Sequence, residues 1–219
     1  HLTLRIALGA SFLASFFTSS YLGPEIPSFS LPLGQAIHYA LLILGVLLIL
    51  GLFTEVVGFI SLIIITLAAF VYKDYMITYF NYFGEFLALI FYGSRFLSVD
   101  KLIFKTKILA EKLKKLEIPI IRIAYGISIL YPAITIKILH PIIIVQIADQ
   151  YHLTQIRWLF PPDPLLISLG TGLAQIAVGI FLIVGFQTRI NAFITLVVYV
   201  LSILYFKEAV WPHYILLAL

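Results

Sequence analysis

Glu85 is the residue in this sequence that most clearly could carry chemistry, because it lies in an otherwise apolar and aromatic stretch, YFNYFGEFLALIF. An ionised carboxylate is costly in such surroundings, so Glu85 must be protonated or paired. An ungapped alignment of FGEFLAL with WPHYILL puts His213 at the position equivalent to Glu85. A carboxyl group and an imidazole at one depth could exchange a proton with a quinol hydroxyl and hydrogen-bond a quinone carbonyl. We therefore predict Glu85 and His213 as proton-exchanging residues.

Further polar residues at a similar depth complete the predicted quinone pocket: Lys73, Asn81, His38 and Gln175. The aromatic side chains near Glu85 would supply flat walls for a quinone ring. The alternative is structural. Glu85 would then pair with Lys73, or with another base at the outer edge, and hold helices together. Lys73 itself could anchor its helix at the membrane interface by snorkelling. Both interpretations stay open from the sequence.

Redox chemistry within this chain is limited by its composition, because the sequence contains no cysteine. A thiolate metal site, an iron–sulfur cluster, a c-type haem and a disulfide all need cysteine. His38 and His213 are weak candidates for haem ligands, and His140 and His152 lack the spacing of a helical metal site. We expect a quinone as the cofactor, with no haem, iron–sulfur cluster or metal in this chain. Electrons would then come from a partner or from a substrate.

The elements that must position these residues are set by an apolar composition. The chain is 62% hydrophobic and 11% charged, whereas a soluble domain has about 25% charged residues. Lipid must therefore be the solvent for most of the surface, and only helices or closed barrels satisfy the backbone there. The apolar runs are too long and uniform for barrel strands. The predicted fold class is an all-α integral membrane protein.

We expect about eight transmembrane helices, each close to the roughly 20 residues that cross a bilayer, at about 3–20, 35–53, 56–72, 77–97, 118–136, 165–185, 190–206 and from 210 onward. Long loops are expected at 21–34 and 137–164, the second with a semi-polar interfacial helix. The stretch 101–117 reads KLIFKTKILAEKLKKLE, with six lysines opposite an apolar face. It predicts an amphipathic linker helix, which the positive-inside rule places in the cytoplasm.

An internal repeat relates the two halves of the chain. Residues 46–73 and 180–207 share a Gly-x-x-Thr turn and a terminal lysine at an offset of 134 (185 − 51 for the two glycines). RIALGASFL, from Arg5, also matches RIAYGISIL, from Arg122, at an offset of 117 (122 − 5). We interpret 1–100 and 118–219 as two tandem four-helix units, the second incomplete at its C-terminal end. Because each unit has an even number of membrane-crossing helices, both units begin on the same side of the membrane, and they should be parallel.

The repeated turns and the arginines have structural interpretations as well as chemical ones. Gly51 and Gly185 are predicted as helix C-caps, and Thr54 and Thr188 as N-caps of the next helices. The alternative is an anion site at the free helix N-termini. Four charged residues are expected near the cytoplasmic end, where they would hold the helices together: Arg5, Arg95, Asp100 and Arg122. Arg5 should pair with Asp100, and Arg122 with an acid beyond residue 219.

These motifs together resemble the DoxX family. The resemblance rests on the Arg-Ile-Ala-x-Gly start, the Gly-x-x-Thr turn and the sequence YGSRFLSVD, with Gly93, Arg95, Ser98 and Asp100. It implies small four-helix membrane proteins, among them the DoxD-type subunit of thiosulfate:quinone oxidoreductase, and here two tandem copies. It also implies a quinone-linked respiratory or sulfur-oxidising role. The isoleucine-rich composition would suit a thermophile.

The sequence therefore predicts a multi-pass plasma-membrane subunit of a quinone-linked oxidoreductase, surrounded by lipid and by other membrane subunits. No motif for nucleic-acid binding is present, so no nucleic-acid partner is expected. A non-catalytic accessory subunit of a larger respiratory complex is the main alternative. A small-molecule transporter is a third, although Pro132 is almost the only mid-helix breaker of the kind that transporters use.

Overall fold

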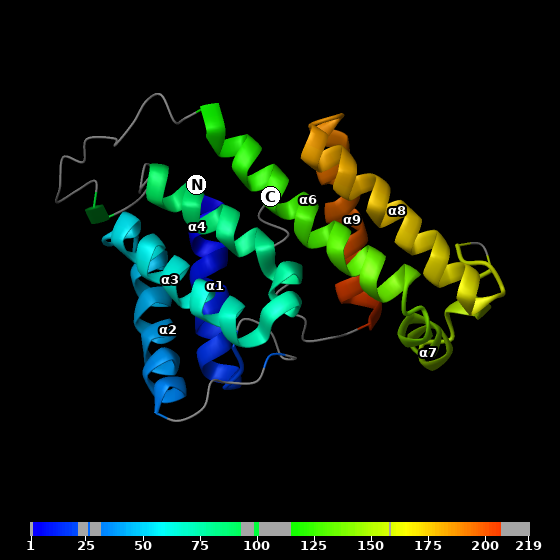
Figure 1. Ribbon diagram of the computed structural model, residues 1–219, viewed down its shortest axis with the longest axis horizontal. Coiled ribbons are helices and arrows are strands. Elements are labelled where there is room, and N and C mark those ends of the chain that lie inside the picture. The colour runs from blue at the N-terminus through cyan, green and yellow to red at the C-terminus, as the bar shows by residue number, and fades with distance from the viewer. Residues whose placement is uncertain are drawn as a thin grey trace.

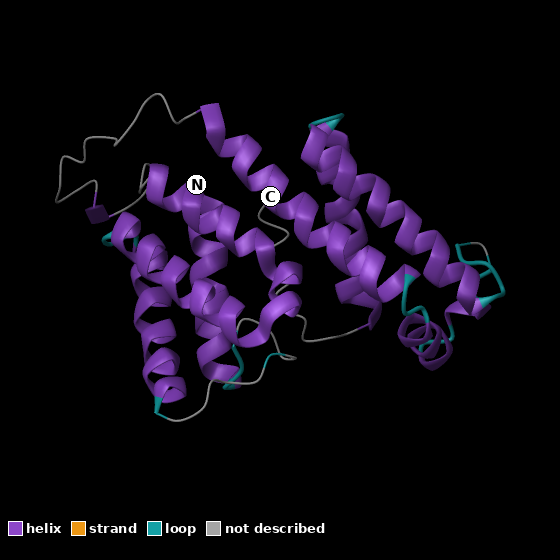
Figure 2. Ribbon diagram, in the orientation of Figure 1, coloured by secondary structure: helices purple, strands orange, loops and turns teal. Residues whose placement is uncertain are grey.

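The computed structural model describes residues 2–21, 26, 32–92, 99–100, 115–157 and 159–206. Its regular secondary structure within these ranges is helical (Figure 2). Several predictions fall outside the described residues: Arg95, His213, the last span and nearly all of the lysine-rich linker.

The first half of the chain forms α1 (Leu2–Thr18), α2 (Leu33–Leu50), α3 (Thr54–Tyr72), the 3-10 helix η1 (Lys73–Tyr79) and α4 (Phe80–Tyr92). The second half forms α6 (Glu117–Pro132), the π-helical turn η3 (Ala133–Ile138), α7 (Ile142–Gln150), the 3-10 turn η4 (Leu153–Gln155), α8 (Pro164–Val184) and α9 (Thr188–Phe206). Each predicted span within the described residues corresponds to a helix, and α7 is the helix expected in the second long loop.

Two helices depart from the predicted ranges. The span predicted at 77–97 becomes α-helical only at Phe80, because the chain first makes the 3-10 helix η1 after a positive φ of 50° at Lys73. The span predicted at 118–136 is α-helical to Pro132 and continues as the π-helical turn η3. Proline lacks the N–H of the helical ladder and crowds the preceding turn, so a change of helix type there is expected.

Four helical segments are long and apolar enough to cross a membrane: Leu33–Leu50, Thr54–Phe91, Glu117–Ile138 and Pro164–Val184. Two shorter apolar helices, Leu2–Thr18 and Thr188–Ser202, accompany them. Large apolar side chains point outward, such as Phe17 at 75% and Phe70 at 76% exposure. Surfaces of this kind are stable against lipid tails and not against water. The protein is therefore a multi-pass membrane protein.

Helices α1 and α2 lie side by side and cross at two glycines (Figure 1). A Cβ atom on Gly9 would lie 2.8 Å from the carbonyl oxygen of Gly45 and 3.2 Å from the backbone nitrogen of Ile49. A Cβ on Gly45 would in turn lie 3.0 Å from the Gly9 carbonyl oxygen. The two backbones are thus in direct contact, as in other close crossings of membrane helices with small residues.

The α6–α8 pair repeats this crossing. A Cβ on Gly126 would lie 2.8 Å from the Gly179 carbonyl oxygen and 3.2 Å from the Ile183 backbone nitrogen, and a Cβ on Gly179 would lie 3.0 Å from the Gly126 carbonyl oxygen. Gly126 follows Gly9 by 117 residues (126 − 9), and Gly179 follows Gly45 by 134 (179 − 45). These are the two offsets of the sequence repeat.

The helices of the first half, α1 to α4, meet the helices of the second half, α6 to α9, where α4 packs along α6 (Figure 1). These two sets are called the two helix groups. Gly84 of α4 lies directly against the Ala124 side chain, and a Cβ on Gly84 would lie 3.2 Å from the Ile120 carbonyl oxygen. Ile121 of α6 also packs against the main hydrophobic core, which is formed by α1 to α4. The small side chains at this contact bring the neighbouring residues of α4 and α6 together.

Gly126→Ala should reduce thermal stability, because its Cβ meets a backbone carbonyl that cannot move aside; overpacking of this kind costs about 1–3 kcal/mol. Gly170→Ala on α8 is the matched control, since a Cβ there meets nothing within 4 Å. The measurement is the melting temperature of the purified protein in detergent. Equal melting temperatures for the two variants would contradict the crossing described here.

Candidate functional site

Glu85 lies inside the contact between α4 and α6, with none of its surface exposed. Its Oε1 accepts a hydrogen bond from the phenol of Tyr125 and a second, of 3.3 Å, from Nδ2 of Asn81. Its Oε2 is also buried and has no hydrogen-bond partner among the described residues. The site is therefore a buried carboxyl group in which two donors hold Oε1 and Oε2 can carry a proton.

The helices bring the three groups together through simple spacing. Asn81 and Glu85 are four residues apart on α4, so they lie on one face of that helix. Tyr125 follows Ala124, the residue that packs against Gly84, and its side chain is fully buried. The Gly84–Ala124 contact thus sets the position of the Tyr125 phenol beside the Glu85 carboxyl.

Other hydroxyl and aromatic groups surround this pair. Tyr82 of α4 shares a 2.9 Å hydrogen bond with Ser11 of α1, and both side chains are buried. Tyr125 interacts electrostatically with Tyr82 and with Tyr199 of α9. The buried cluster therefore draws on α1, α4 and α6. Such an environment, with phenols as donors and no exposed surface at the carboxyl, can hold a proton on Glu85 or pass one to a neighbour.

Of the predicted quinone-pocket residues within the described ranges, Asn81 alone has a recorded contact with Glu85. Lys73 is exposed at the start of η1, whereas Glu85 is fully buried, and no contact between the two is recorded among the described residues. Gln175 is half-buried on α8. His38 stacks on Phe16, with ring centroids 4.4 Å apart.

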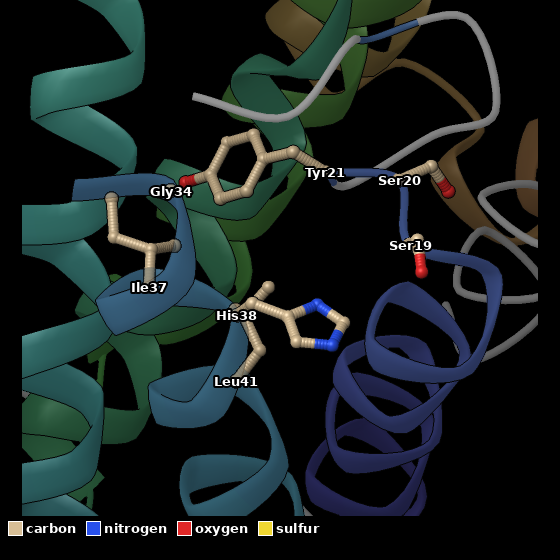
Figure 3. A pocket seen from close by; sticks show the side chains of 7 residues that line it. All are labelled: Ser19, Ser20, Tyr21, Gly34, Ile37, His38 and Leu41. Carbon is tan, nitrogen blue, oxygen red and sulfur yellow. The ribbon is translucent and has the colours of Figure 1, made fainter. Parts of the chain in front are cut away.

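A shallow hollow lies beside His38, between the end of α1 and the start of α2 (Figure 3). Its lining consists of Ser19, Ser20, Tyr21, Gly34, Ile37, His38 and Leu41. The space inside is that of about one water molecule. A quinone ring does not fit there, and it cannot touch the unexposed carboxyl of Glu85 in this arrangement either.

The Gly-x-x-Thr turn after α2 is closed by an acid from far along the chain. Gly51 ends α2 in the left-handed conformation, with φ 69°. The capping position of α3 is Phe53 and not Thr54, which is the first helical residue. Asp100 supplies the cap: Oδ1 accepts from the Phe53 N–H at 2.7 Å, and Oδ2 from the Thr54 N–H at 3.0 Å. A carboxylate at a helix N-terminus also complements the helix dipole.

Arg5 is buried and interacts electrostatically with Asp100, and the predicted pair stays a prediction. The position of Asp100 nevertheless rests on the backbone hydrogen bonds of the turn, which the sequence prediction did not include. The recorded hydrogen bonds of Asp100 thus tie it to the N-terminus of α3.

The Gly-x-x-Thr turn after α8 also has a left-handed glycine, but its neighbour is Arg122 and not an acid. Gly185 ends α8 with φ 88°, and Thr188 begins α9. Nη2 of Arg122 donates to the Ile183 carbonyl oxygen at 3.3 Å, and its guanidinium occupies the space that a Cβ on Gly185 would need. The acid predicted to pair with Arg122 would lie beyond residue 219, so that prediction stays open.

Tyr125 is the site residue that sequence reasoning missed. A tyrosine in an apolar helix is unremarkable in a chain with 13 tyrosines. The repeat did hold a signal. RIALG and RIAYG differ at a single position, where Leu8 in the first unit is replaced by Tyr125 in the second.

Asp100→Ala should destabilise the protein by about 1–2 kcal/mol, the usual effect of losing a helix N-cap. The variant removes the acceptor of two backbone N–H groups and the partner of Arg5. Asp149→Ala is the control, since Asp149 is exposed on α7. Melting in detergent measures the difference, and equal losses for both variants would contradict the capping role.

Comparison with known proteins gives one match. The DoxX family model matches residues 118–208, which run from α6 to the end of α9. No curated protein and no solved structure matches the chain. The match supports the DoxX family for this membrane protein.

Proposed function

We propose that this DoxX-like chain is the membrane subunit of a quinone-linked oxidoreductase, of a respiratory or sulfur-oxidising type, in which Glu85 and Tyr125 exchange protons. The observation that carries the proposal is the state of the Glu85 carboxyl: fully buried, held at one oxygen by a phenol and without a hydrogen-bond partner at the other among the described residues. Ionisable groups within a membrane are costly and are usually functional.

The proposal includes two tandem DoxX-like units. Its support is the pair of glycine crossings, α1 on α2 and α6 on α8, which follow the two offsets of the sequence repeat. The family match covers the second unit, 118–208. The resemblance of 1–100 to the same pattern extends the assignment to the first.

Quinone reduction takes up two electrons and two protons for each ring, and in this proposal the electrons come from a partner subunit or substrate. The residues near Glu85 suit proton exchange, but they leave no space for a ring against the carboxyl itself. We therefore assign no direct contact between Glu85 and a quinone. The roles assigned here are that Asn81 and Tyr125 hold the carboxyl in place, that Tyr125 exchanges a proton with it and that Glu85 stores the proton.

A second candidate function is a non-catalytic accessory subunit. One observation favours it: the Tyr125–Glu85 bond joins the two helix groups, so the pair could serve packing alone. A buried polar contact of this kind can be retained for structural specificity.

Glu85→Gln separates the two functions, because glutamine keeps the shape and an oxygen acceptor for Tyr125 but cannot carry the proton. We expect quinone reduction by the purified complex to fall by about 10²-fold, the scale of general acid–base catalysis, with melting temperature and subunit composition unchanged. Asp149→Asn on the exposed face of α7 is the matched control. Normal turnover in Glu85→Gln would rule out the catalytic role and leave the accessory one.

A further inference from the structure

A row of tyrosines leads from the protein surface to the Glu85 site. Tyr75 and Tyr79 belong to η1, and Tyr82 lies three residues before Glu85 on α4. The three-residue steps from Tyr79 to Tyr82 and from Tyr82 to Glu85 keep these three side chains on one side of the helical segment. Exposure falls steadily along the row: 42% at Tyr75, 4% at Tyr79, 1% at Tyr82 and 0% at Glu85.

The aromatic rings of neighbouring tyrosines in this row lie close to one another. The ring centroids of Tyr75 and Tyr79 are 6.1 Å apart, and those of Tyr79 and Tyr82 are 6.2 Å apart. At the inner end, the Tyr82 hydroxyl shares its 2.9 Å hydrogen bond with Ser11, and Tyr82 lies one helical turn from Glu85 on α4. Tyr125 then donates directly to Glu85.

The outer end of the row is polar. Lys73 and Asp74 begin η1 and are exposed, next to Tyr75. Charged groups at this level can be hydrated at the membrane boundary. A hydroxyl both donates and accepts a hydrogen bond, so a series of phenols can pass protons by small rotations, whereas the phenylalanines beside them cannot.

We propose that Tyr75, Tyr79, Tyr82 and Tyr125 form a proton route between the membrane boundary at η1 and the buried Glu85. The route would let Glu85 exchange protons without touching a quinone or bulk water. It rests on the proposed function, which gives this proton exchange its purpose. In each transfer a phenol gives its proton to the next acceptor and takes one from the preceding donor, so no net charge or electron is left behind.

The test is hydrogen–deuterium exchange of the Glu85 carboxyl, followed by infrared spectroscopy after transfer of the full chain in lipid nanodiscs to D₂O. The C=O band of protonated Glu85 is identified by its loss in Glu85→Gln. Tyr82→Phe keeps the ring contacts and removes the hydroxyl, so exchange should slow by about tenfold or more, as expected when a positioned proton carrier is lost. Tyr79→Phe should act in the same direction.

Tyr39→Phe is the matched control, since Tyr39 is 61% exposed on α2 and lies outside the row; its exchange rate should equal that of the unmodified protein. Unchanged or faster exchange in both Tyr82→Phe and Tyr79→Phe would overturn the route, as would the lack of any band that depends on Glu85. The measurement uses no quinone and no partner. A failure of quinone turnover to depend on Glu85 is therefore a separate result, which bears on the proposed function alone.

Discussion

The hydrogen bond from Tyr125 to Glu85 determines how the two helix groups of this protein can meet. A buried carboxyl oxygen without a hydrogen-bond donor is costly. The bond can form only if the α4 and α6 backbones come close, which Gly84 and Ala124 allow. Any larger residue at either position would separate the donor from the acceptor and leave a carboxyl group stranded among apolar side chains.

The two glycine crossings are alike, but the residues beside them differ in chemistry. The contacts of each glycine with the carbonyl oxygen of the other, seen for Gly9 and Gly45, recur for Gly126 and Gly179. Leu8, however, occupies the position in the first unit that Tyr125 has in the second. The acid–phenol pair is therefore present once among the described residues, at the contact of α4 with α6.

Much of the framework was predictable because lipid imposes strong constraints. Long apolar runs must become helices, and glycine at the end of such a run must adopt the left-handed conformation when the chain turns back, as Gly51 and Gly185 do. Glu85 could be singled out because it is an acid in an apolar helix. The functional assignment of the pocket depended on depth alone, and depth along a helix does not say which residues face one another.

The parts that could not be predicted are contacts between distant segments. Tyr125 is 40 residues from Glu85 along the chain, and its role depends on the rotation of α6 against α4. The capping of α3 by Asp100 likewise depends on a positive φ of 51° at Phe53, a residue type that rarely adopts it. Local propensity places the helix boundary at Thr54. The distant carboxylate, which binds the free N–H groups, moves the cap by one residue.

The central claim, that the Tyr125–Glu85 bond couples the two helix groups, is tested most directly by a double-mutant cycle. Glu85→Leu, Tyr125→Phe and the double variant are compared by their unfolding free energies in mixed micelles. We predict a coupling energy of about 1–3 kcal/mol, with the double variant less destabilised than the sum of the single variants. Additive losses, equal within about 0.5 kcal/mol, would show that the two side chains do not interact and would contradict the account.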